Sequence, residues 1–71
     1  MSSEKIYLKL SIKDAKLLAA ANKVLKRWAV YDKATKSWDI TEHSHIVRYR
    51  FDKVLPTGRW EYDGNQAVFQ L

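Results

Sequence analysis

The chain has 71 residues, of which 13 are lysine or arginine and 8 are aspartate or glutamate, so its formal net charge is +5. This length predicts a single domain, residues 1–71, with a thin core, because a chain this short buries only about 60% of the surface that its unfolded form exposes. It has no cysteine, which excludes disulfide bonds and thiolate metal sites, and no apolar run approaching the ~20 residues of a membrane-spanning helix.

The first predicted element is a strand, because residues 5–11 alternate apolar and polar side chains. Ser11 is a suitable N-cap with Asp14 three residues later, so we expect a helix to begin at Ile12. Apolar residues then recur at spacings of three and four and predict one buried helical stripe. This stripe consists of Leu17, Leu18, Ala21, Val24, Leu25 and Trp28.

The end of this helix leaves two alternatives. The apolar spacing could carry the helix to Tyr31, or the helix could end near Lys26 and residues 28–40 could form a β-hairpin around a polar turn at residues 32–36. The hairpin is favoured, because the flanking segments are rich in aromatic and β-branched residues and alternate in polarity.

The second half of the chain reads as strands and turns. Residues 45–51 alternate Val47, Tyr49 and Phe51 with Ile46, Arg48 and Arg50, which predicts a strand. Turns are predicted at residues 56–58 and 63–65, and strands at residues 59–62 and 66–71.

These elements predict an α+β domain, in which an N-terminal strand is followed by one amphipathic helix packed on an antiparallel β-meander. The expected order is β-α-β-β-β-β, with room for one strand more. The expected core joins the helical stripe to Ile6, Leu8, Leu10, Val47, Tyr49, Phe51, Trp60, Tyr62 and Phe69. Because the chain ends within a strand, we expect an open sheet edge that could recruit a partner strand or form a homodimer.

Positive charge is concentrated in the first half of the chain. Residues 1–36 hold nine lysines and arginines against three acidic residues, whereas residues 37–71 hold four against five. No acidic residue lies between Ala15 and Tyr31, so the exposed helix face is expected to be cationic without the Glu–Lys pairs of an ordinary solvated helix. The candidate contact residues are Lys13, Lys16, Lys23, Lys26, Arg27, Arg48 and Arg50.

A second basic surface is expected on the sheet face turned away from the helix. Lys9, Arg48, Arg50 and Arg59 would surround Tyr7 there, with Glu61 as the main opposing charge. Such a surface could bind phosphates and bases, or it could simply keep an exposed sheet soluble.

The two histidines give the only hint of a metal site. His43 and His45 would face the same way on a strand, beside Asp39 and Glu42. Two histidines without a dependable third ligand do not predict a metal site, and the sequence contains no catalytic motif. We therefore expect neither a metal, nor another cofactor, nor enzymatic activity.

Two functions fit this pattern. The first is a basic nucleic-acid-binding protein that contacts the phosphate backbone of DNA or RNA with low sequence selectivity. The second is a small protein-binding regulator or inhibitor, of the stand-alone kind that phages encode, which docks its basic face on an acidic surface of a larger protein or nucleoprotein complex. The N-terminus has no signal-peptide segment, so a cytoplasmic location and no membrane partner are expected.

Overall fold

Each of two helices is followed by a pair of strands in the computed structural model, which describes residues 5–71. The strands are β1 (Tyr7–Ser11), β2 (Val30–Asp32), β3 (Ser37–Asp39), β4 (Arg59–Asp63) and β5 (Gln66–Gln70). The helices are α1 (Ala15–Trp28) and α2 (Ser44–Val54). The predicted α+β class is therefore confirmed, with two helices in place of the expected one. Within residues 5–71, neither helix is long and apolar enough to cross a membrane.

The five strands form one mixed sheet in the order β2-β3-β1-β5-β4. β1 pairs antiparallel with β3 but parallel with β5, so the sheet is not the purely antiparallel meander that the sequence predicts. The reason is that α2 carries the chain from β3 to the opposite edge of the sheet, where β4 lies. The β4–β5 hairpin then places the last strand between β4 and β1. The open edge that the sequence predicts therefore does not lie at the last strand, because β5 is interior and the edges are β2 and β4.

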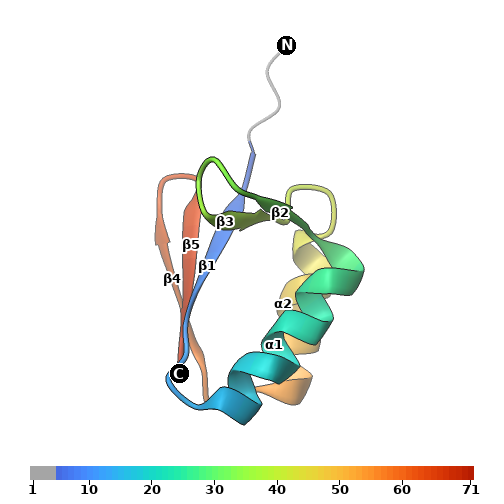
Figure 1. The fold of residues 1–71 in the computed structure, drawn as a ribbon, viewed down its shortest axis with the longest axis vertical. Helices are drawn as coiled ribbons and strands as arrows, with labels where there is room; N and C mark the ends of the chain where they lie inside the picture. The colour runs from blue at the N-terminus through green and yellow to red at the C-terminus, as the bar shows by residue number, and fades with distance from the viewer. Residues whose placement is uncertain (1–4) are drawn as a thin grey trace.

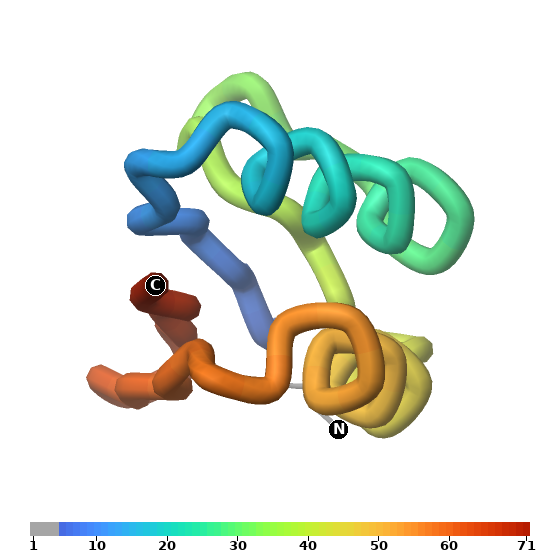
Figure 2. The backbone as a smooth tube through the Cα atoms, turned by 90° about the horizontal axis from the view of Figure 1, so that it is seen from below, coloured from blue at the N-terminus to red at the C-terminus, as the bar shows by residue number. Residues whose placement is uncertain are grey.

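Both helices lie on the same face of the sheet and cross each other, while no helix formed by residues 5–71 covers the other face (Figures 1 and 2). Between the layers, β1 and β5 contribute apolar side chains that meet the stripes of α1 and α2. The fully enclosed apolar residues are Leu8, Ala21, Leu25, Ile40, Val47, Phe51, Leu55, Ala67 and Phe69. Trp28 and Trp60 are half-buried and pack against this cluster, in line with their predicted place in the core.

Helix α1 begins three residues later than predicted. Its N-cap is Asp14, whose side chain accepts hydrogen bonds from the backbone N–H groups of Lys16 (2.9 Å) and Leu17 (3.1 Å). Ser11 cannot serve as the cap, because it belongs to β1 and pairs with Gln70 of β5. The helix ends at Trp28, between the two predicted ends, and the predicted hairpin follows as β2 and β3.

The largest error of the sequence reading concerns residues 45–51, which lie in helix α2 and not in a strand. Val47, Phe51 and Leu55 recur every four residues and are all enclosed, so this spacing buries one helical stripe. Tyr49, which strand alternation would bury, is 57% exposed, and Tyr62, also predicted for the core, is 53% exposed. Packing against the sheet therefore overrides the strand propensity of this segment.

Turns flank β4 on both sides, as predicted, and the second one joins β4 to β5. Gly58, after the turn at residues 56 and 57, lies so close to Phe69 that a Cβ atom would overlap the aromatic ring. Gly64 has a φ of 61°, which glycine adopts without strain, and begins the two-residue turn between Asp63 and Gln66.

Candidate nucleic-acid interface

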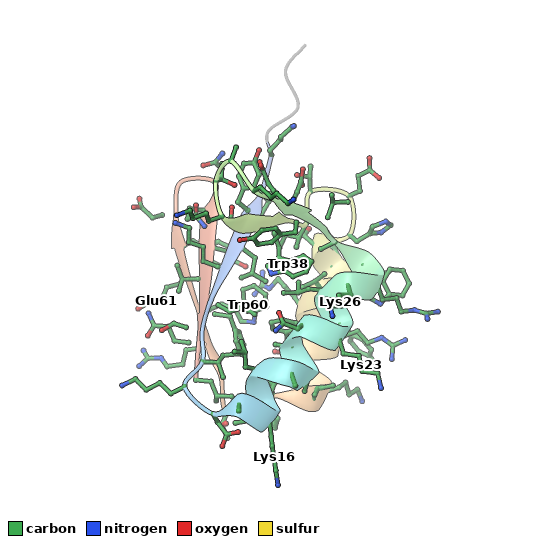
Figure 3. All side chains as sticks on the ribbon, viewed as in Figure 1. Lys16, Lys23, Lys26, Trp38, Trp60 and Glu61 are labelled. Carbon is green, nitrogen blue, oxygen red and sulfur yellow. The ribbon has the colours of Figure 1, made fainter. Side chains whose placement is uncertain are left out.

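Helix α1 presents a cationic ridge, which we define as Lys16, Lys23, Lys26 and Arg27. All four side chains are exposed, and α1 contains no acidic residue. Figure 3 shows Lys23 extending from α1 on the side away from the sheet and Lys16 extending beyond the lower end of α1. At ~1.5 Å per residue, the ridge from Lys16 to Arg27 is about 16 Å long. Lys13 lies just before the helix, in the exposed connection from β1.

Helix α2 adds Arg50 to this surface. A shallow hollow of about 340 Å³ lies between the helices and is lined by Lys23, Val24, Arg27, Trp28, Arg50 and Val54. Three of these six residues are cationic and none is a carboxylate. Arg50 reaches the hollow because α2 is a helix, which places Arg50 and Val54 one turn apart on the flank that faces α1.

Trp28 lies at the border of the basic surface, because it lines both the hollow and a second groove beside it. The Arg27 guanidinium lies over its ring, 5.5 Å from the ring centroid, a distance at which a cation and an aromatic face attract each other. The ring of His43 meets Trp28 edge-on at 5.6 Å. Trp28 thus holds Arg27 beside the hollow while keeping part of its own surface accessible.

Beyond Trp28 lies a second open groove, of about 470 Å³, whose charges are mixed. Lys5 and Arg27 line it together with the carboxylates of Asp39 and Glu42. Asp39 accepts hydrogen bonds from the Thr41 hydroxyl (2.6 Å) and the Thr41 backbone N–H (3.0 Å). These bonds, with help from the positive charge of Lys5, lower the pKa of Asp39 below its usual value of 3.8 although burial opposes them. Two anionic groups make this groove a poor phosphate site.

The histidine pair does not take the geometry that the sequence suggests. His43 is the residue before α2 and His45 lies in its first turn, so the two rings do not share the face of a strand. Within residues 5–71, no three histidine, cysteine, aspartate or glutamate side chains are grouped closely enough to hold a metal ion.

Arg48 does not join the other predicted contact residues. Two positions along a helix turn a side chain by about 200°, so Arg48 lies on the flank of α2 opposite to Arg50. Its guanidinium lies over the rings of Trp60 (5.6 Å) and Tyr62 (5.5 Å).

The predicted basic surface on the helix-free sheet face is therefore wrong. Arg48 and Arg50 both belong to α2, on the other side of the sheet, which leaves Lys9 and Arg59. These two share the face with Glu61 and Asp63, because Lys9, Val68 and Glu61 form one register row. The charges on this face nearly balance.

The sequence reading missed the hollow and the part that Trp28 and Val54 play in it. The usable signal was the four-residue spacing of Val47, Phe51 and Leu55, which predicts a helix and turns Arg50 toward α1. Comparison with known proteins adds no relative: no family model, no curated protein and no solved structure matches this chain.

Proposed function

We propose that the protein is a non-catalytic nucleic-acid-binding protein that grips the phosphate backbone of DNA or RNA with low sequence selectivity. The observation that supports this most is the hollow between α1 and α2, where Lys23, Arg27 and Arg50 converge without a carboxylate among the lining residues. Neighbouring cations repel one another, and a bound phosphate relieves that repulsion.

The shape of the ridge supports the same proposal. At ~3.4 Å per step along one strand, its length of about 16 Å matches about five nucleotides of a duplex. Lysine is a flexible point charge that carries little information about base identity, so we expect weak selectivity. The proposal includes a cytoplasmic location, where nucleic acids are abundant.

The test is a titration of labelled duplex DNA, single-stranded DNA and RNA at several salt concentrations. If the four ridge residues and Arg50 neutralise five phosphates, log affinity should fall with log salt at a slope of about −4.5. Between about 50 and 200 mM salt, the affinity should then fall by about 500-fold. The triple variant Lys16→Gln, Lys23→Gln, Lys26→Gln should reduce the steepness of the slope by about 2.7.

A matched control removes the same charge elsewhere. Lys9 lies on the helix-free sheet face, and Lys33 and Lys36 lie in the turn between β2 and β3. Replacing these three lysines by glutamine should leave the slope close to that of the parent protein. The proposal would be contradicted if the two triple variants reduced the slope equally, or if the parent protein did not bind nucleic acid at the lowest salt concentration.

A second function is favoured by the composition of the hollow. Trp28 and Arg27 are of the residue types that dominate protein–protein hot spots, and Val54 beside them is 46% exposed. A regulator that docks on an acidic protein surface would use these side chains as its anchor. In that case nucleic acids should not bind at low salt. A single stoichiometric protein should instead be retained from nuclease-treated lysate and lost in the Arg27→Glu variant.

A further inference from the structure

Strand β4 is an edge of the sheet, and its pairing with β5 shows which of its backbone N–H and C=O groups have no partner strand. The Tyr7 N–H donates to the Asn65 carbonyl (3.0 Å) and the Leu71 N–H donates to the Ser11 carbonyl (3.1 Å), so residues 67 and 69 of β5 bond to β1. The alternate residues 66, 68 and 70 bond to Asp63, Glu61 and Arg59 of β4. The N–H and C=O groups of Trp60 and Tyr62 therefore point outward from the sheet.

This edge carries charged side chains, Arg59, Glu61 and Asp63, but it lacks the proline or bulge that would block strand addition. β4 has no proline, its register with β5 is continuous over residues 59–63, and its side chains on the helix-facing side are the aromatic rings of Trp60 and Tyr62. Tyr62 is 53% exposed. The other edge, β2, is only three residues long, so β4 is the better template for a further strand.

The side chains of β4 are complementary to an antiparallel copy of themselves. On the helix-free face, Arg59 stands at one end of the strand and Asp63 at the other, with Glu61 between them. We propose that β4 pairs antiparallel with β4 of a second copy of this chain, around a two-fold axis at Glu61. Each Arg59 then faces Asp63 of the second copy, and each Trp60 faces Tyr62 of the second copy.

This register uses all the free backbone groups of the edge. Trp60 and Tyr62 of each copy exchange both of their outward bonds, which gives four hydrogen bonds across the axis. Sliding by two residues in one direction places Tyr62 opposite Gly58, whose N–H already donates to the Leu55 carbonyl (3.1 Å). Sliding in the other direction places Glu61 opposite Asp63, which sets acid against acid. The axis at Glu61 brings only the two Glu61 carboxylates together as a like-charged pair.

Such a dimer would also double the proposed interface. A two-fold axis perpendicular to the sheet leaves the helices of both copies on the same face, so both α1–α2 hollows open on one side of a continuous sheet. The pairing itself depends on β4 alone, so it can hold or fail whether or not the protein binds nucleic acid.

The first test is sedimentation equilibrium from micromolar to hundreds of micromolar protein, without nucleic acid. Arg59→Asp should weaken the dimer about 10-fold, because it turns two attractive pairs into two repulsive ones. Asp63→Arg should weaken it similarly, and the double variant Arg59→Asp, Asp63→Arg should restore it to within about 3-fold of the parent. Lys9→Asp makes the same charge change on the same face, in the interior strand β1, and should have no effect.

Two further measurements fix the register. Glu61→Gln should tighten the dimer by a few-fold, whereas it should weaken a dimer in which Glu61 faces Arg59. Hydrogen exchange should show concentration-dependent protection of the Trp60 and Tyr62 amides, while the Glu61 amide, bonded to β5, is protected at every concentration. A parent protein that stays monomeric throughout, or a double variant that fails to recover, would overturn the proposal. If a variant does not fold, the exchange pattern of the parent protein decides.

Discussion

At the scale of single residues, Thr41 links two segments that are distant along the chain. Its hydroxyl accepts a hydrogen bond from the Ile6 backbone N–H (2.9 Å) and donates one to the Asp39 carboxylate (2.6 Å). Its own backbone N–H donates to the same carboxylate oxygen (3.0 Å). Thr41 thereby ties the residue before β1 to the end of β3, and its two hydrogen bonds lower the pKa of Asp39.

Thr41→Val should therefore raise the pKa of Asp39 toward 3.8 and lower the free energy of unfolding by about 1–3 kcal/mol at neutral pH. A folded-state pKa below the unfolded value stabilises the protein above the unfolded pKa, and this stabilisation is lost as pH falls through the folded pKa. The difference in the free energy of unfolding between variant and parent should therefore become smaller in acid. The loss that remains there is due to the Ile6 N–H, which has lost its hydrogen bond to the Thr41 hydroxyl. NMR titration of Asp39 and urea denaturation at neutral and acid pH measure both effects. Thr57→Val, in an exposed turn, is the control and should change neither.

At the scale of elements, α2 shows how a short segment can satisfy two periodicities. Val47 and Phe51 are four residues apart, so they share a face both on a strand and on a helix. The residue that discriminates is Tyr49, which a strand would bury and α2 exposes. Local sequence predicted the body of α1 and the β4–β5 hairpin well, because a long apolar stripe and the Gly64 turn have one interpretation each, whereas it only favoured the β2–β3 hairpin over a longer helix.

Replacing the two aromatic residues separately tests the helical assignment. Phe51 is fully buried and packs on Phe69 and Trp60, with ring centroids 4.8 and 5.5 Å apart, so Phe51→Ala should cost about 3–5 kcal/mol of stability. Tyr49→Ala should change stability by no more than about 0.5 kcal/mol, because Tyr49 is 57% exposed and lies outside the core cluster. Denaturant unfolding of both variants provides the comparison. Similar losses would instead indicate a strand, on which the two rings share one face.

At the scale of the whole molecule, the first and last strands, β1 and β5, lie side by side and parallel within the sheet. β5 lies between β1 and β4 and contributes the enclosed residues Ala67 and Phe69 to the core. The pairing of β1 with β5 joins residues about 60 positions apart, so it forms only when the rest of the chain is in place.

Deletion of residues 66–71 should consequently unfold the whole protein and not merely fray one edge. The deletion removes the partner of both β1 and β4 and opens the core around Phe51. Circular dichroism and amide dispersion in NMR spectra should show loss of α1 together with the sheet. A truncated chain that keeps a folded α1 and a cooperative thermal transition would contradict this central role of β5.

The sequence by itself determined the α+β class, helix α1 with its cationic ridge, and the β4–β5 hairpin, and it favoured the β2–β3 hairpin, because periodicity and turn chemistry act over neighbouring residues. The tertiary structure alone decided that residues 44–54 form a helix, that β1 and β5 run parallel, and that β4 forms an edge. It also brought Arg50 to Lys23 and Arg27 while sending Arg48 to Trp60. The reason is physical: where the local sequence permits both helix and strand, the choice falls to the conformation that buries more apolar surface, and that burial depends on residues far apart in the chain.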